Sequence, residues 1–122
     1  KDDIFVSTDI GQLQQVVLNI IDNAIDATGK GGIVNVSTAK EGMYGVIRVR
    51  DNGPGIPPDR LHQIFDPFFT TKRPGEGTGL GLSICYSIME GLGGDVSAAN
   101  HPSGGAEFTI RLPASNSTDG GM

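Results

Sequence analysis

The sequence predicts an α+β domain, a two-layer sandwich in which helices cover one face of a mostly antiparallel β-sheet. Between residues 9 and 28, apolar side chains recur at three- and four-residue spacing, as in an amphipathic helix. In residues 33–39, 44–51 and 106–112, apolar and polar side chains alternate, as in strands with one buried face. Weaker patterns elsewhere bring the expected total to about five strands and three helices.

The first elements are a short strand and a long helix. Residues 4–7 are mainly apolar and predict the strand. Asp9 and Gln12 have the spacing of a capping box at the start of the helix, and Gly29 is expected to end it. One face of this helix carries an apolar stripe: Leu13, Val16, Val17, Ile20, Ile21, Ala24 and Ala27.

The remaining elements follow in order along the chain. The strands at 33–39 and 44–51 are joined by a turn at Glu41-Gly42, which predicts a hairpin. Two further helices are expected at 59–65, after a proline pair, and at 80–92. The last two strands are expected at 96–100 and 106–112. The segment from 66 to 81 is rich in Gly, Pro and Thr, and so long a loop in a small domain indicates a functional role.

The composition limits the class of protein. A chain of 122 residues fits one domain, which we assign to residues 1–113, and the polar residues 114–122 are expected to form a disordered tail. The net charge of −5 argues against nucleic acid as a partner. No apolar run suggests contact with a membrane. The single Cys85 fits a reducing, cytoplasmic compartment. The start at Lys1 suggests a piece of a longer protein, which could itself be membrane-anchored.

A candidate binding residue lies at the end of the strand 44–51. Asp51 shares its strand face with Ile47 and Val49, so its carboxylate is expected to point toward the core. A buried carboxylate needs hydrogen-bond donors. The following Asn52-Gly53-Pro54-Gly55-Ile56 lets the backbone approach a ligand closely. Asp51 could also simply cap a structural turn, but Asp-x-Gly-x-Gly-Ile after a strand favours a ligand site.

Two asparagines on the long helix are candidate metal-site residues. Asn19 and Asn23 are one turn apart and share a face, with Asp22 and Asp26 beside them. An amide oxygen suits Mg²⁺, which keeps most of its waters and binds the phosphates of a substrate. The alternative is two solvated asparagines on an exposed helix surface.

A glycine-rich loop is the third candidate. Glycines concentrate where it enters the helix 80–92, and amide groups at a helix start favour phosphate. A flexible hinge is the alternative, and neither a Walker loop nor a dinucleotide-binding fingerprint is present. Three aromatic residues, Phe65, Phe68 and Phe69, lie at the mouth of the preceding loop. The loop also contains a basic pair, Lys72 and Arg73, which could meet phosphate or lie exposed in solvent.

The order of these motifs resembles the ATP-binding catalytic domain of sensor histidine kinases, in the superfamily of gyrase, the ninety-kilodalton heat-shock chaperone and the mismatch-repair ATPase. The likeness extends from about Ile4 to Pro113. It implies a Bergerat-type fold with a mixed sheet, binding of ATP and Mg²⁺, and Asn23 as the Mg²⁺ ligand. By the same likeness, Asp51 would recognise the adenine amino group. The other implied binding residues are Asn19, Gly53, Gly55, Ile56, Phe65, Phe68, Lys72, Gly77, Thr78, Gly79, Leu80, Gly81 and Leu82.

Two positions depart from the family pattern. Asp26 stands where many relatives have a basic residue, so Lys72 or Arg73 would have to neutralise the phosphates. Ala106 stands where a Thr or Ser is common, in a stretch from Gly105 to Phe108 that resembles the family's last glycine motif.

The resemblance predicts a kinase fragment rather than a hydrolase. Hydrolases of the superfamily activate water with a Glu where this chain has Asn19, and an amide cannot accept that proton. The acceptor would be a histidine on a separate helical dimerisation domain, and a response regulator would act downstream. His62 and His101 have no acidic neighbour and do not match that acceptor. The alternatives are a serine kinase of the anti-sigma-factor type and a non-catalytic docking module with an ATP-shaped pocket.

Overall fold

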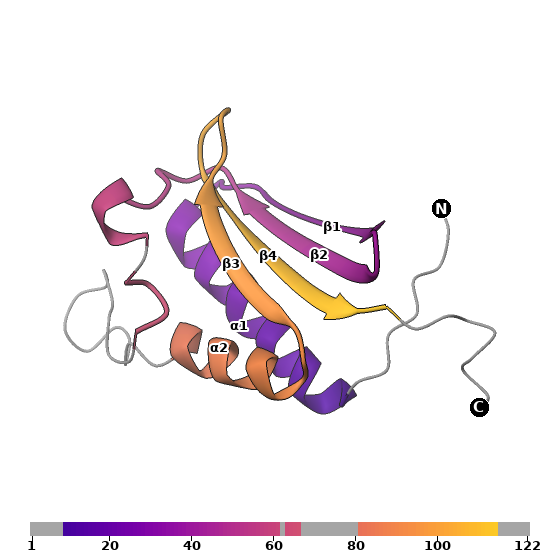
Figure 1. Ribbon diagram of the computed structural model, residues 1–122. Coiled ribbons are helices and arrows are strands. Elements are labelled where there is room, and N and C mark those ends of the chain that lie inside the picture. Colours follow the sequence, from indigo (N-terminus) through magenta and orange to yellow (C-terminus); the bar gives the residue numbers. More distant parts are fainter. Residues whose placement is uncertain (1–8, 62, 67–80, 115–122) are drawn as a thin grey trace, which may run out of the picture.

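A computed structural model describes residues 9–61, 63–66 and 81–114. These residues form a four-stranded antiparallel sheet with the order β1-β2-β4-β3. Figure 1 shows helices α1 and α2 on the same side of this sheet. The predicted α+β class and the two-layer arrangement are therefore confirmed. The predicted strand at 4–7 lies outside the described residues.

Helix α1, Ile10–Thr28, has the ends that the sequence predicts. The Gln12 amide donates to Asp9 Oδ1 at 3.2 Å, which satisfies one of the free amides of the first turn. At the other end, the Gly29 amide donates to the Ile25 carbonyl at 3.1 Å, and the helix stops. Val16, Ile20 and Ala24 of the predicted apolar stripe are buried under the sheet.

Strands β1, Val34–Glu41, and β2, Tyr44–Asp51, form the predicted hairpin. Strands β3, Asp95–Asn100, and β4, Ala106–Pro113, form a second hairpin, and β4 pairs with β2 in the middle of the sheet. Ala106, Phe108, Ile110 and Leu112 are all buried, as the alternation in β4 predicts. Helix α2, Gly81–Gly91, lies within the predicted range 80–92.

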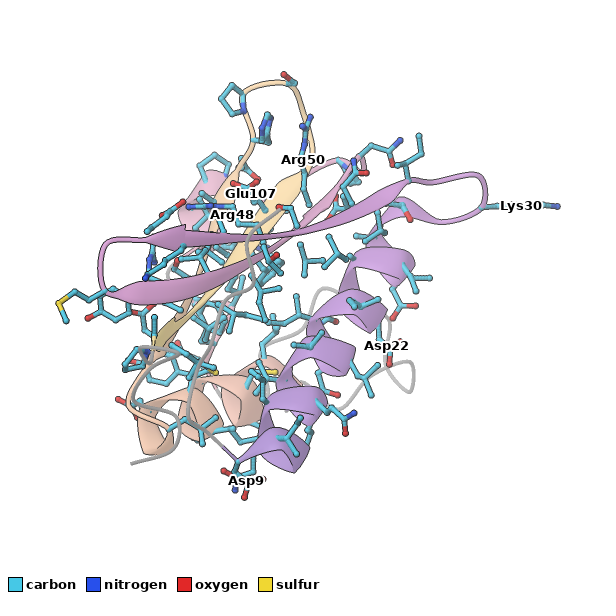
Figure 2. All side chains as sticks on the ribbon, turned by 90° about the vertical axis from the view of Figure 1, so that its right-hand side faces the viewer. Asp9, Asp22, Lys30, Arg48, Arg50 and Glu107 are labelled. Carbon is cyan, nitrogen blue, oxygen red and sulfur yellow. The ribbon has the colours of Figure 1, made fainter. Side chains whose placement is uncertain are left out.

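The core lies between the sheet and the two helices. Its largest fully buried side chains there are Val16, Ile20, Val49, Cys85, Met89 and Ile110. The other face of the sheet is polar. Figure 2 shows Arg48, Arg50 and Glu107 on the side away from the helices, where Arg48 forms an ion pair with Glu41 at 2.6 Å. This bond lowers the pKa of the Glu41 carboxyl.

The helix predicted at 59–65 is wrong. The structure has a short 3₁₀ helix, η1, at Pro58–Arg60, followed by turns. Three successive backbone bonds in this segment each span three residues: Arg60 to Pro57 at 2.8 Å, Gln63 to Arg60 at 2.9 Å and Asp66 to Gln63 at 2.9 Å. This is the 3₁₀ hydrogen-bond spacing, and the proline that starts the segment donates no backbone hydrogen bond. The described part of the chain thus has two α-helices instead of the three expected.

Candidate nucleotide site

The centre of the candidate site is the buried carboxylate of Asp51, at the end of the central strand β2. Its side chain is 3 % exposed. Oδ1 accepts hydrogen bonds from the amide of Gly53 at 2.9 Å and from the amide of Ala106 at 3.2 Å. Two backbone donors compensate for part of the cost of burying a charge. Among the described residues, none donates a hydrogen bond to Oδ2.

The loop after Asp51 is held close to the protein backbone on both sides. A Cβ at Gly53 would lie 2.8 Å from the carbonyl oxygen of Ala27, in the last turn of α1. A Cβ at Gly105, which has φ +82°, would lie 1.9 Å from the carbonyl oxygen of Asp51. Only glycine fits where the start of β4 passes so near the end of β2. The Asp-x-Gly-x-Gly motif is therefore fixed between α1 and the β3–β4 hairpin.

The two asparagines of α1 share a helix face with Ala27, whose backbone carbonyl lies beside this loop. Asn19, Asn23 and Ala27 follow one another at four-residue intervals, so they share one face. Ala27 touches the loop at Gly53, and Asn23 lies about 6 Å before it along the helix axis. Both asparagine side chains are half-buried, which argues against the alternative of fully solvated residues.

Helix α2 adjoins α1 beside Asn19. The Cys85 thiol is fully buried and donates to the Val16 carbonyl at 3.8 Å. Burial raises the pKa of the Cys85 thiol, and a hydrogen bond with Asn19 partly opposes this rise. Gly81 is one turn before Cys85, and in Figure 1 the start of α2 lies on the same side as the C-terminal half of α1. The first turn of α2 and the asparagine face therefore border the same region.

Phe65 anchors the segment after η1 to the core. The centroid of its ring lies 6.3 Å from that of Phe108 of β4, in an edge-on arrangement, and 5.9 Å from that of Tyr86 of α2. Leu82 is also half-buried and packs against the core. The other candidates in the loop lie outside the described residues: Phe68, Phe69, Lys72, Arg73, Gly77, Thr78, Gly79 and Leu80.

Asn100 contacts Ile56 of the candidate site, although the sequence does not predict this contact. Asn100 Oδ1 accepts a hydrogen bond from the Ile56 amide, and Asn100 Nδ2 donates to the Ile56 carbonyl, each at 2.7 Å. Asn100 precedes the His-Pro-Ser-Gly-Gly turn and has the local signature of a turn residue. Its partner is 44 residues away, so no local pattern indicates the contact.

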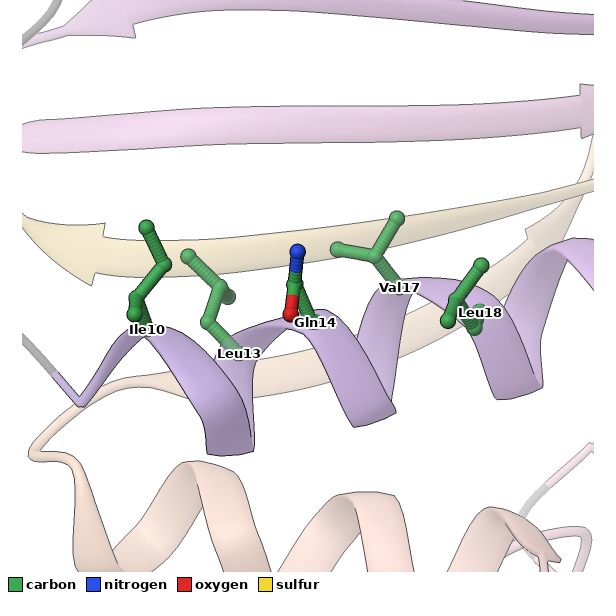
Figure 3. Close-up of a pocket in the computed structure, with 5 residues that line it drawn as sticks. All are labelled: Ile10, Leu13, Gln14, Val17 and Leu18. Atoms are coloured by element: carbon green, nitrogen blue, oxygen red, sulfur yellow. The ribbon is translucent and has the colours of Figure 1, made fainter.

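A separate groove lies on the N-terminal half of α1. It has a volume of about 310 Å³ and is lined by Ile10, Leu13, Gln14, Val17 and Leu18 (Figure 3). Four of these five side chains are apolar and none is charged, so the groove lacks the cationic side chains that bind phosphate. It contains none of the candidate nucleotide-binding residues. Neither described helix combines the length and the apolar character that a membrane span requires.

The side-chain amide oxygen of Asn23 is a type of ligand that Mg²⁺ accepts. The described residues hold no group of three or more His, Cys, Asp or Glu side chains that could bind a metal ion. An amide oxygen with few other protein ligands is the arrangement in which Mg²⁺ keeps its waters and the phosphates of its substrate.

Comparisons with known proteins agree with this geometry. Residues 8–116 match the family of histidine kinase-, DNA gyrase B- and HSP90-like ATPases. Sporulation kinase C of Bacillus subtilis is 43% identical over 112 residues, which are 92% of this chain and 26% of that protein. Sensor histidine kinase ZraS of Escherichia coli K12 is 43% identical over 108 residues, 88% of this chain and 23% of that protein. The chain thus spans about a quarter of these curated relatives.

Solved structures show the same fold. The catalytic domain of histidine kinase ThkA superposes with a TM-score of 0.82 at 36% identity, over 93% of this chain and 74% of that one. Full-length ShkA in complex with AMPPNP gives a TM-score of 0.81 at 33% identity, over 94% of this chain and 24% of that one. The chain therefore belongs to the family of histidine kinase-, DNA gyrase B- and HSP90-like ATPases.

Proposed function

We propose that this chain is the ATP-binding catalytic domain of a two-component sensor histidine kinase, which transfers the γ-phosphoryl group of Mg·ATP to a histidine on a separate helical dimerisation domain. The observation that carries the proposal is the buried Asp51 carboxylate. Two backbone amides fix one of its oxygens, and no described residue donates to the other. The similarity to named sensor histidine kinases supports the same activity.

Asp51 would recognise the adenine ring. Its Oδ2 can accept a hydrogen bond from the 6-amino group, while Gly53, Gly55 and Ile56 form the adjoining wall of the pocket. A hydrogen bond to a charged acceptor contributes about 1.5–3 kcal/mol. A guanine ring presents an oxygen at the same position, which a carboxylate repels. Asp51 would therefore select adenine over guanine nucleotides.

Asn19 and Asn23 would lie beside the phosphates. Asn23 would hold Mg²⁺ through its amide oxygen, and the bound ion would neutralise charge on the phosphate oxygens. The glycine-rich residues before α2, with Lys72 or Arg73, would provide further donors to the phosphates. Phosphoryl transfer depends mainly on such positioning and charge neutralisation.

Asn19 favours transfer to an external acceptor over hydrolysis. Its amide cannot take a proton from water, so the site has no base one turn before Asn23. In the transfer, a ring nitrogen of the acceptor histidine attacks the γ-phosphorus, the bond from this phosphorus to the β–γ bridging oxygen breaks, and ADP leaves. A response regulator would then receive the phosphoryl group. A cytoplasmic location fits the need for ATP and the free thiol of Cys85.

The test follows labelled phosphate from γ-³²P-ATP with Mg²⁺. We expect no label on this chain alone, and label on the helical acceptor domain of the same parent protein when both are mixed. An acceptor domain whose histidine is replaced by alanine is the control. The label should be lost in acid, as expected for phosphohistidine.

Other outcomes would contradict the proposal. Label on this chain alone would show an acceptor within it. Acid-stable label on a serine would indicate a kinase of the anti-sigma-factor type. ATP binding without transfer to the acceptor domain would indicate a non-catalytic docking module.

A further inference from the structure

The side chain of Asn100, at the end of β3, binds both backbone polar groups of Ile56 in the loop after β2. The Ile56 amide donates to Asn100 Oδ1, and Asn100 Nδ2 donates to the Ile56 carbonyl, each at 2.7 Å. One side-chain amide thus makes the pair of backbone hydrogen bonds that a neighbouring strand would make with Ile56. Because Asn100 is itself exposed, its contribution here comes from this pair of bonds and not from apolar burial.

The packing around this contact leaves the loop little freedom. Gly55 has φ +83°, and a Cβ there would lie 2.8 Å from Asn100 Oδ1 and 3.6 Å from the carbonyl oxygen of Gly105. On the other side, the half-buried Ile56 side chain packs against the core. The Gly55–Ile56 segment is therefore confined between the Asn100 amide and the core.

The same end of the β3–β4 hairpin also fixes Asp51. Asn100 and Ala106 are direct partners across this hairpin, and the Ala106 amide donates to Asp51 Oδ1 at 3.2 Å. Ala106 thus binds the Asp51 carboxylate, and Asn100 binds Ile56, which follows Asp51 by five residues in the chain. The position of Ile56 relative to Asp51 Oδ2 depends on both contacts.

We propose that Asn100 is a positioning residue for purine recognition, which sets the preference for adenine by fixing the Gly55–Ile56 wall against Asp51. This inference rests on the proposed nucleotide site. Adenine gains a hydrogen bond only when the wall aligns its 6-amino group with Oδ2. Guanine has no such donor there and gains little from the alignment. Loss of the contact should therefore weaken ATP binding more than GTP binding.

The test compares two variants with a matched control. Asn100→Leu keeps a similar volume and removes both hydrogen bonds. Asn100→Asp keeps an acceptor for the Ile56 amide and loses the donor to the carbonyl. Asn35→Leu is the control, because Asn35 is an exposed strand asparagine on β1, at the opposite edge of the sheet, outside the candidate site. Calorimetry measures the Kd for Mg·ATP and Mg·GTP, and hydrogen exchange measures protection of the Ile56 amide in the free protein.

We expect Asn100→Leu to weaken ATP binding about tenfold, the equivalent of about one neutral hydrogen bond. GTP binding should change much less, so the ratio of the Kd for GTP to the Kd for ATP should decrease. Asn100→Asp should weaken ATP binding at least as much as Asn100→Leu, because its second carboxylate oxygen would face the Ile56 carbonyl oxygen, and Asn35→Leu should match the wild type. Protection of the Ile56 amide should fall in Asn100→Leu without any nucleotide present. If Asn100→Leu does not fold, Asn100→Ser, which is too short to reach both groups, provides the same comparison.

Two results would overturn the inference. The first is an unchanged preference for ATP over GTP in Asn100→Leu, whether or not the affinity for both nucleotides falls equally. This result would show that Asn100 takes no part in base recognition. Absence of ATP binding by the wild type, or full binding by Asp51→Asn, would remove the proposed site and this inference with it. These cases differ, because in the first the wild type binds ATP and Asp51→Asn loses it.

Discussion

The Ala106 amide nitrogen lies 3.2 Å from Asp51 Oδ1, although the two residues are 55 positions apart in the sequence. This contact joins the start of β4 to the end of β2, where the two central strands meet the candidate site. It depends on Gly105, because any side chain at that position would collide with the Asp51 backbone. Stability and binding are therefore coupled at this end of the sheet.

Gly105→Ala should be much more destabilising than an ordinary glycine substitution. The new Cβ would lie 1.9 Å from the Asp51 carbonyl oxygen, so the strand ends would have to separate. We expect a loss of about 3–4 kcal/mol in the free energy of unfolding. Gly42→Ala is the control, since Gly42 also has a positive φ, +62°, but nothing lies within 4 Å of its added Cβ. That change should cost about 1–2 kcal/mol. If urea denaturation gave the two variants equal losses in the free energy of unfolding, the close approach of Gly105 to the Asp51 carbonyl would be disproved.

Asp9 should stabilise α1 by capping its first turn. The Gln12 amide donates to its side chain at 3.2 Å, and Asp9→Ala leaves that amide without this acceptor. We expect the free energy of unfolding to fall by about 1 kcal/mol. Asp9→Ser, which keeps a capping oxygen, should lose only a small part of this. Thermal and urea unfolding of the three proteins measure the difference, and an Asp9→Ala protein as stable as the wild type would refute the cap.

Cys85 should make stability fall at high pH. Below about pH 9 the thiol is protonated in both states, because its unfolded reference pKa is 9.0. Burial raises the folded pKa above that value, so the unfolded state ionises first as the pH increases. The free energy of unfolding should therefore decline from pH 9 upward, more steeply in the wild type than in Cys85→Ala. Parallel pH profiles from urea denaturation would contradict this.

The same burial predicts slow chemical labelling. Cys85 is fully buried, so a thiol reagent at neutral pH should react only as fast as the domain opens. Labelling in increasing urea should follow the unfolding curve. Rapid labelling of the native protein would show that the thiol is not buried against α1.

Asn19→Glu should increase ATP hydrolysis. This change places a carboxylate one turn before Asn23, where it can accept a proton from water. General-base catalysis contributes about 10²–10⁴-fold, so even a poorly aligned carboxylate should give a measurable increase in phosphate release. Asn19→Gln has the same size but no base and is the control. Equal phosphate release by the two variants would mean that position 19 does not face the reacting phosphate.

The sequence predicts the strands and helices well where apolar periodicity is strong. β2 has the predicted bounds, and α1 begins and ends at its predicted caps. The helix expected at 59–65 is wrong because the segment has three-residue hydrogen-bond spacing after a proline, which an apolar pattern does not reveal.

The candidate site is predictable where its residues belong to local motifs. Asp51 could be identified because its strand face and the following glycines are adjacent in sequence. Asn100 could not, since its partner Ile56 is 44 residues away and its own surroundings resemble a turn. Contacts between segments distant in the chain depend on tertiary packing, and a single sequence carries no signal for them.

The affinity of Asp51→Asn for ATP tests the central claim most directly. The amide oxygen can still accept from Gly53 and Ala106, so the fold should survive, but an NH₂ group would replace Oδ2 and oppose the adenine amino group. We predict at least about tenfold weaker binding of Mg·ATP, and a smaller loss for ITP, whose base carries an oxygen at that position. Asp59→Asn, an exposed carboxylate in η1, should bind as the wild type does. Unchanged ATP affinity in folded Asp51→Asn would contradict the account.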